Sequence, residues 1–165
     1  MTDAERFEAF VREYQHMVFA TAVRMLGNRA EAEDVSQTVF MRAFQRFAEV
    51  GGSPTVAGWL KTVTTNLCLN HLTRYRARWQ FFSEADIPEP TAPDRGTELG
   101  IDADRHERLE QAMRRLPDHQ RVPLVLFHFE ERSYQEIAAL LGVSLSKVKT
   151  DMHRGREKLK RVLTR

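Results

Sequence analysis

The sequence predicts an all-α protein of two small helical domains joined by a flexible, acidic linker that contains prolines. Apolar residues recur at steps of three and four, the spacing of one helix face, over residues 1–82 and again over residues 102–165. Residues 83–101 break this pattern with prolines, glycines and acidic residues. The chain has no polar-apolar alternation long enough to predict a strand.

The composition excludes several classes of protein. With 42% apolar and 29% charged residues, the chain is neither disordered nor fibrous. It contains no apolar run of the roughly 20 residues that a membrane span needs, and acidic residues stand where a signal peptide would be basic. We therefore expect a cytoplasmic protein without membrane insertion.

The sequence also lacks the residue patterns of a metal site or a catalytic nucleophile. The histidines lack metal-ligand spacing, and the single cysteine, Cys68, lies in an apolar helical stretch where a buried, inert thiol is expected. We expect no cofactor, no metal and no catalytic activity.

Domain 1–82 is predicted to begin with two helices. The first spans about residues 3–26 and ends at Gly27, while the second begins with Asn28 as its N-cap and ends near Phe47. The apolar stripe of the second helix, expected to face the core, comprises Ala32, Val35, Val39, Ala43, Phe44 and Phe47.

A third helix is predicted to begin with Ser53 as N-cap and Pro54 in the first helical position, and to extend as far as Trp79. Asn66, Asn70 and Arg74 follow one another at intervals of four along it, with aromatic residues and further arginines beyond. Bases and aromatics together can hold phosphates and stack unpaired bases. The alternative is an ordinary exposed helix end whose aromatic residues pack into the core.

The second helix also carries a mixed polar and apolar face away from its stripe. Phe40 and Met41 are large apolar residues there with no evident core to fill, and they lie among Asp34, Gln37 and Arg42. Such a face suggests a partner protein. Simple solvation and docking of the second domain are the alternatives.

In domain 102–165, a helix over about residues 102–116 is stopped by Pro117, and an apolar helical segment follows over about residues 120–129. Its Pro123 is tolerable only near a helix start. The rest of the domain, from Ser133 to about Arg161, predicts a helix-turn-helix.

The helix-turn-helix is predicted from its caps. Ser133 with Glu136 forms a capping box, Gly142 ends the short first helix, and Ser144 caps the second. At 100° per residue, the core side of the second helix and its groove side are opposite stripes. The core side comprises Val148, Met152, Gly155 and Leu159, and the groove side comprises Ser146, Thr150 and His153.

We predict that Lys149, Thr150 and His153 contact base edges, because the N-terminal part of a recognition helix enters the major groove. Lys147 and Arg154 would contact phosphates, and Ser144 could offer its hydroxyl or the helix N-terminus to a phosphate. A basic, merely solvated helix is the alternative. The helix dipole, however, disfavours lysines in the first turns, so it does not account for Lys147 and Lys149.

These motifs resemble the short bacterial sigma factors of the extracytoplasmic-function group, over nearly the whole length. The resemblance rests on Ala32-Glu33-Asp34 through Phe40, on Gly58-Trp59-Leu60 leading to Asn70, on Leu116-Pro117 to Phe127, and on Ser133 through Val148. It implies that the first domain binds the clamp helices of core RNA polymerase and recognises and opens the minus-ten element of promoter DNA. The second domain would read the minus-thirty-five element. An anti-sigma protein usually holds such a factor inactive, and the free factor is expected to be a monomer.

Carried over by position, the resemblance assigns roles to three groups of residues. The polymerase-binding surface would comprise Asp34, Gln37, Phe40 and Arg42. The minus-ten surface would comprise Trp59, Asn66, Asn70, Arg74 and Arg76, with the loop from Gly52 to Val56 helping to hold a flipped base. The minus-thirty-five readers would be Lys149, Thr150 and His153.

The chain departs from the family at Asp151, where a basic residue is common. A carboxylate near phosphates is unfavourable, so Asp151 would either pair with Lys147 one turn earlier or accept a hydrogen bond from a cytosine amine.

A linker of about twenty residues has a root-mean-square span of only about 25 Å, well short of the roughly 50 to 70 Å between two promoter elements. We therefore expect the free chain to bind promoters poorly and polymerase to hold the domains apart. A stand-alone helix-turn-helix regulator, which binds a palindrome as a dimer without polymerase, is the alternative.

Overall fold

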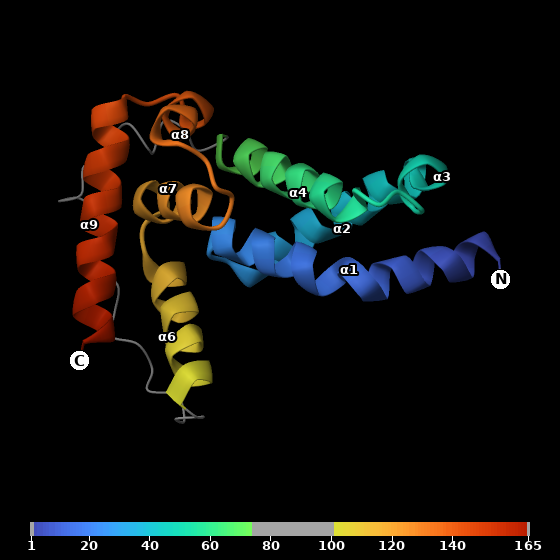
Figure 1. Cartoon of the computed structure of the whole chain (residues 1–165), viewed down its shortest axis with the longest axis horizontal. Coiled ribbons are helices and arrows are strands. Elements are labelled where there is room, and N and C mark those ends of the chain that lie inside the picture. The colour runs from blue at the N-terminus through green and yellow to red at the C-terminus, as the bar shows by residue number, and fades with distance from the viewer. Residues whose placement is uncertain (1, 74–100, 165) are drawn as a thin grey trace. The chain divides into compact units, whose positions relative to one another are not determined.

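A computed structural model describes residues 2–73 and 101–164 of the chain, and every regular element in these two ranges is an α-helix. The chain divides into two compact units, residues 1–72 (unit 1) and residues 73–165 (unit 2). The predicted all-α, two-domain architecture is thereby confirmed (Figure 1).

Unit 1 begins with two long, packed helices whose ends follow the predicted caps. α1 (Asp3–Leu26) starts at a capping box between Thr2 and Glu5 and ends at Gly27, whose φ of 68° suits glycine. α2 (Arg29–Gln45) starts at Asn28, whose side chain accepts a hydrogen bond from the Glu31 amide at 3.0 Å. Both starts agree with the sequence prediction.

The predicted end of the second helix is wrong by two residues. The backbone leaves helical geometry at Arg46, with φ −115° and ψ 19°, and a separate short helix, α3 (Phe47–Val50), follows. This break turns Phe47 toward α1, where its ring lies 5.4 Å from the rings of Phe7 and Phe10.

The third predicted helix also begins later than expected. α4 (Val56–Thr73) starts three residues after Ser53, because the Ser53 hydroxyl accepts a hydrogen bond from the Thr55 amide at 3.2 Å and so closes a local turn. Pro54 therefore lies in this turn and not in the first helical position. The predicted extension to Trp79 falls outside the described residues.

The core of unit 1 is formed mainly by apolar side chains of α1, α2 and α4. From α2 it takes Ala32, Val35, Val39 and Ala43, as predicted. The prediction is wrong for Phe44, which is 63% exposed. Its side chain points away from the core because successive residues of a helix are 100° apart, and the preceding Ala43 is the one that is buried. Cys68 is buried, as expected.

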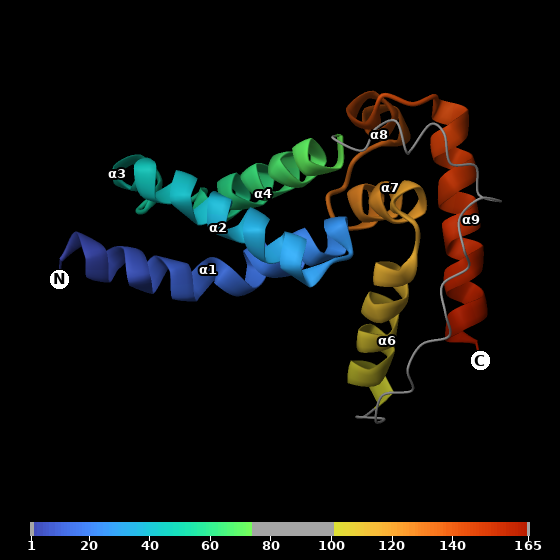
Figure 2. The same cartoon turned by 180° about the vertical axis from the view of Figure 1, so that it is seen from behind.

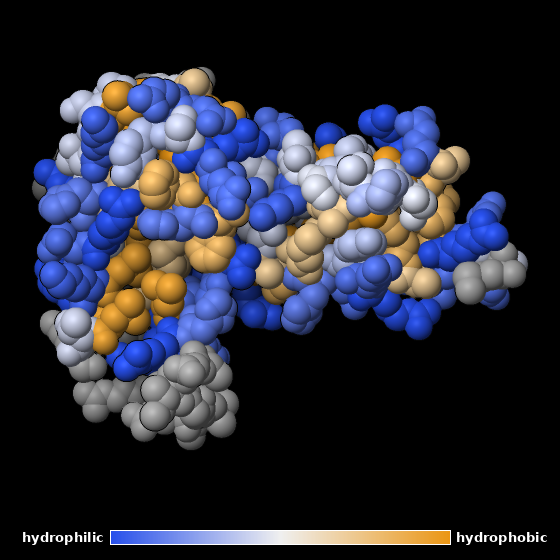
Figure 3. Space-filling model, viewed as in Figure 1, coloured by the Kyte–Doolittle hydropathy of each residue, from blue (hydrophilic) through white to orange (hydrophobic). Residues whose placement is uncertain are grey.

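Unit 2 is built around its longest helix. α6 (Ile101–Arg115), α7 (Asp118–His128) and α8 (Tyr134–Leu141) lie along one side of α9 (Leu145–Leu163), as both views show (Figures 1 and 2). Apolar side chains gather between α6 and α9 (Figure 3). Every side chain of α7 from His119 to Leu126 is buried, which makes this helix the centre of the unit.

Two details of unit 2 differ from the prediction. α7 begins at Asp118, so Pro123 is inside the helix rather than in its first turn. Because proline has no amide hydrogen, the helix loses one hydrogen bond there. α9 continues to Leu163, two residues beyond the predicted end.

The helix-turn-helix has the predicted caps. The Ser133 hydroxyl accepts from the Glu136 amide at 3.1 Å, and the Glu136 carboxylate accepts from the Ser133 amide at 3.3 Å. Gly142 takes the left-handed conformation with φ 68°, and the Ser144 hydroxyl caps α9 by accepting from the Lys147 amide at 3.1 Å. These local signals fix the short turn between α8 and α9.

Candidate nucleic-acid and protein interfaces

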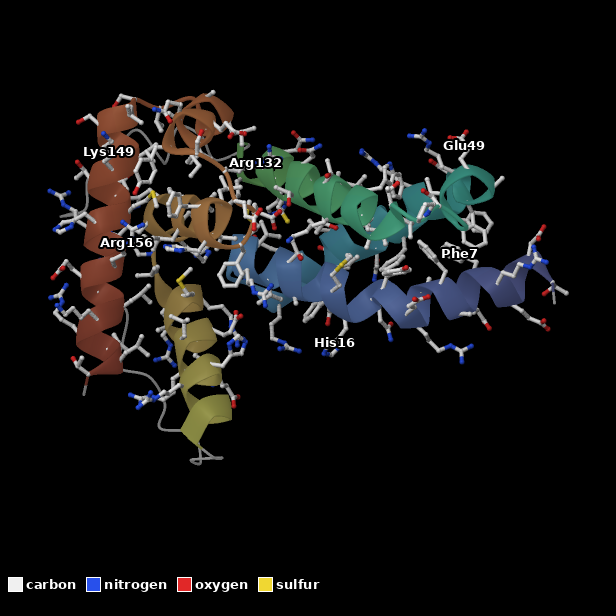
Figure 4. The ribbon with its side chains drawn as sticks, viewed as in Figure 1. Phe7, His16, Glu49, Arg132, Lys149 and Arg156 are labelled. Atoms are coloured by element: carbon white, nitrogen blue, oxygen red, sulfur yellow. The ribbon has the colours of Figure 1, made fainter. Side chains whose placement is uncertain are left out.

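The exposed face of α9 contains the side chains that the sequence predicts to meet DNA. Its buried side comprises Val148, Met152 and Gly155, together with the flanking Asp151 and Lys158. Facing solvent are Ser144, Ser146, Lys149, Thr150, His153 and Arg154. The helix therefore presents its N-terminal half as a polar, basic surface (Figure 4 labels Lys149).

Gly155 lets α9 lie close to α7. A Cβ atom at this position would stand 2.8 Å from Leu124 Cδ1 and 3.3 Å from Gln120 Cβ. Since Leu124 and Gln120 are both fully buried, neither has free space to move into. This contact sets which side of α9 faces the core and which side faces outward.

Lys147 differs from the other predicted DNA contacts. Its Nζ donates a hydrogen bond to Oδ2 of Asp151 at 2.8 Å, one turn further along α9. Asp151 is buried and Lys147 is half-buried. Of the two alternatives open for Asp151, the structure contains the pair with Lys147.

An aromatic and basic cluster joins the ends of α7 and α8 to α9, and the sequence analysis missed it. The Phe127 ring stacks on Tyr134 at 4.9 Å, and the Arg156 guanidinium lies 5.7 Å from the centre of the Phe127 ring (Figure 4). Nε2 of His128 is 3.4 Å from Nη2 of Arg156. Desolvation, and secondarily the positive charge of Arg156, lower the pKa of His128. The neutral form of His128 is therefore favoured beside Arg156.

Unit 1 has an apolar groove between α1 and α2 with a volume of about 850 Å³. Its lining includes Val11 and Phe19 from α1, and Phe40, Met41 and Phe44 from α2. Met41 is 64% exposed and Phe44 is 63% exposed, so two large apolar side chains of one helix face solvent at the groove. This is the exposed mixed face that the sequence indicated, extended by Phe44 and by residues of α1.

Aromatic rings support one end of the groove. Phe7 on α1 is directed toward α3, on which Glu49 lies (Figure 4). Its ring lies 5.1 Å from Phe44 and 5.4 Å from Phe47, in edge-to-face arrangements. The aromatic ring of Phe7 therefore packs beside both Phe44 and Phe47 at this end of the groove.

The four residues predicted to bind polymerase are divided by the structure. Gln37 and Phe40 line the groove, while Asp34 and Arg42 are exposed on α2 outside its lining. No linear motif could have identified the contribution of Phe7, Val11 and Phe19, which come from another helix.

α4 carries the described part of the predicted minus-ten surface. Asn66 and Asn70 are exposed one turn apart, and Trp59 is half-buried near the start of the helix. The Arg46 guanidinium lies 5.9 Å from the centre of the Trp59 ring and bonds Glu49 at 3.0 Å, a contact that sequence reasoning missed. Arg74 and Arg76 lie outside the described residues.

Residues 2–73 and 101–164 lack two further kinds of feature. They contain no group of three or more His, Cys, Asp or Glu side chains placed to hold a metal ion. Within the same ranges, no helix combines the length and apolar character needed to span a bilayer.

Comparisons with known proteins point to one family. The Sigma-70 region 2 family matches residues 10–78, and the Sigma-70, region 4 family matches residues 106–159. The RNA polymerase sigma factor YlaC of Bacillus subtilis is 30% identical over 167 residues, covering 100% of this chain and 96% of that protein. The ECF sigma factor SigW of the same organism is 27% identical, covering 98% of this chain and 90% of its own length.

Two further similarities concern a longer relative and a solved structure. The ECF sigma factor SigE of Mycolicibacterium smegmatis is 35% identical over 96% of this chain, which spans 62% of that protein. The co-crystal structure of the sigma factor RpoE with the anti-sigma factor NepR from Bartonella quintana contains a chain of the same fold. Its TM-score is 0.51 at 19% identity, with 96% of each chain covered.

The region 2 match covers most of unit 1, with its exposed apolar groove, and the region 4 match lies in unit 2, with its helix-turn-helix. The chain belongs to the extracytoplasmic-function group of the sigma-70 family, the sigma factors that direct RNA polymerase to promoters.

Proposed function

We propose that this sigma factor binds core RNA polymerase through the groove between α1 and α2 and reads promoter DNA with the exposed faces of α4 and α9. The observation that carries the proposal is the exposure of Met41 and Phe44, at 64% and 63%, beside an apolar groove of about 850 Å³. Burying apolar surface yields about 25 cal/mol per Å², so a partner helix seated here gains affinity directly.

The groove suits the clamp helices of polymerase as its occupant. Its lining is mainly apolar and aromatic, and it also includes the exposed Gln37, Arg29 and Glu33, which can fix the register of a partner helix by hydrogen bonds and charge. Asp34 and Arg42, exposed on the same helix, would extend this polar rim.

For the minus-thirty-five element, we assign base contacts to Ser146, Thr150 and His153, with Lys149 at the edge. Arg154 and the hydroxyl of Ser144 would contact phosphates at the two ends of this surface. The assignment is supported by the exposure of all six side chains, of which five lie on α9, whose other side is packed, and the sixth, Ser144, is its N-cap.

For the minus-ten element, we assign Asn66 and Asn70 to base contacts, because both amides project from the exposed side of α4. Trp59 offers a ring for stacking, and the nearby Arg46 supplies a positive charge. Arg74 and Arg76 would continue this surface along the strand.

Two further proposals follow from the family. The fold neighbour is a sigma factor crystallised with an anti-sigma factor, and we propose that an anti-sigma protein likewise holds this chain inactive. The protein would act in the cytoplasm, as a binding subunit of polymerase without catalytic chemistry of its own.

Transcription from a randomised promoter library tests the proposal. Core polymerase with this protein should initiate only on templates that share two sequence elements, one upstream of the other by about one and a half to two helical turns. Initiation without any enriched sequence, or tight binding of a palindrome in the absence of core, would instead support a stand-alone regulator.

A further inference from the structure

Lys147 and Asp151 form an ion pair at the edge of the proposed DNA surface of α9. Lys147 Nζ lies 2.8 Å from Asp151 Oδ2, and the two side chains are 30% and 8% exposed. Lys149, two residues along, is exposed. We propose that Asp151 is a positioning residue that holds Lys147 away from the DNA backbone, leaving Lys149 and Arg154 as the cations of this surface. The inference rests on the proposed reading of DNA by α9.

Helix geometry separates the pair from the base-reading stripe. Ser146, Thr150 and His153 centre on the outer side of α9, whereas Lys147 lies about 95° and Asp151 about 135° around the helix from that centre, toward its packed side. The Asp151 carboxylate is therefore buried beside the core and does not face a base edge. Acceptance of a hydrogen bond from a cytosine amine is not compatible with this position.

The charges explain why the pair should persist when DNA binds. Lys147 sits in the first turn of α9, where the positive end of the helix dipole disfavours a cation, and the Asp151 carboxylate offsets that effect. If Lys147 left for a phosphate, a buried carboxylate would lose its counter-charge. The loss of a buried partner outweighs one solvent-exposed phosphate contact, because exposed ion pairs contribute little.

The pair has a measurable consequence for promoter binding. Each phosphate neutralised by a cation adds about 0.9 to the slope of log affinity against log salt. Holding Lys147 back removes one such contact, so affinity falls about 3.5-fold less between 50 and 200 mM salt than it would with Lys147 on a phosphate. A larger share of the remaining affinity then depends on base sequence.

The test measures this slope for holoenzymes on a duplex carrying a promoter recovered from the transcription library. We expect Asp151→Asn to free Lys147 and steepen the slope by about 0.9. Lys147→Gln alone and the Lys147→Gln/Asp151→Asn double variant should both keep the wild-type slope. Lys149→Gln, a lysine two residues away that is exposed, is the matched control and should make the slope shallower by about 0.9.

The opposite results would overturn the proposal. An unchanged slope in Asp151→Asn, or a slope shallower by about 0.9 in Lys147→Gln, would show that the pair does not withdraw Lys147. Thermal unfolding checks that each variant folds. If a single variant is unfolded, the Lys147→Gln/Asp151→Asn double variant tests the proposal, because its salt slope is expected to equal that of wild type. A shallower slope in the double variant would contradict the proposal. Absence of promoter binding by the wild-type holoenzyme would be a different failure, that of the proposed function itself.

Discussion

Gly155 on α9 lies directly against Leu124 on α7, so closely that a Cβ atom at position 155 would stand 2.8 Å from Leu124 Cδ1. Leu124 is 1% exposed and has little room to give way. The contact seats α9 on the core of unit 2 and leaves Thr150 and His153 facing outward. A methyl group at this position should therefore disturb the packing that orients the proposed DNA surface.

Gly155→Ala should destabilise unit 2 by about 1 kcal/mol. Overpacking costs about 1–3 kcal/mol, and the better helix propensity of alanine recovers about 1 kcal/mol of it. Chemical denaturation, followed by a probe in unit 2, gives the free energy of unfolding. Gly58→Ala is the matched control: it lies in α4, where an added Cβ would have no neighbour within 4 Å beyond the adjoining residues and backbone of its own helix, and it should stabilise unit 1. Equal effects from both substitutions would contradict the packing argument.

The stability of the helix-turn-helix should depend on pH through Glu136. The amide and hydroxyl of Ser133, and then Arg132, lower the pKa of this carboxyl from its ordinary value of 4.5. Because the folded state favours the charged form, the contribution is present above that value and is lost as the pH falls through the lowered pKa. Glu136→Gln keeps the capping geometry without the charge. Between about pH 5.5 and about pH 3, the free energy of unfolding should therefore fall less for Glu136→Gln than for wild type. An equal fall in both proteins would contradict the role of the Glu136 charge.

Met41→Gln should weaken binding to core polymerase about tenfold without loss of stability. The side chain is 64% exposed, so the folded chain does not depend on it, while burial of a methionine in an interface contributes about 1.5 kcal/mol or more. Fluorescence titration with core enzyme measures the affinity. Ala9→Gln, exposed on α1 and absent from the groove lining, should bind as wild type. Similar affinities for all three proteins would exclude the groove as the polymerase site.

Thr150→Ala should relax the base preference at one position of the upstream element by about 1–3 kcal/mol. The downstream element should stay unchanged, because only unit 2 is altered. Library transcription with the variant holoenzyme gives both preferences at once. Glu157→Gln, exposed near the same side of α9 but two turns further on, should leave the base preference intact. A loss of preference in both elements would argue against separate readers.

The helix-turn-helix could be predicted from the sequence because its caps act over short distances. Ser133 and Glu136 bond across three residues, and Gly142 ends the first helix by its own backbone angle. The side of α9 that faces outward followed from the same local periodicity. For these features, little information from the rest of the fold is needed.

Unit 1 shows where local information was insufficient. α2 breaks at Arg46, and Phe47 then packs against Phe7, a residue forty positions away in the sequence. Phe44 continued the apolar stripe by its spacing, yet it lies 100° around α2 from the buried Ala43 and is exposed at the groove. The Lys147–Asp151 spacing suggested a pair, but the burial of its carboxylate depends on how α9 packs and could not be read from spacing.

We propose that promoter recognition belongs to the complex with polymerase, in which the groove of unit 1 would be occupied and both DNA-reading helices positioned. Its most direct test compares the affinity of the free chain and of the holoenzyme for one promoter duplex and for a scrambled duplex. We predict tight, sequence-specific binding by the holoenzyme and weak binding with little sequence preference by the free chain. Comparably tight and specific binding by the free chain would contradict this proposal.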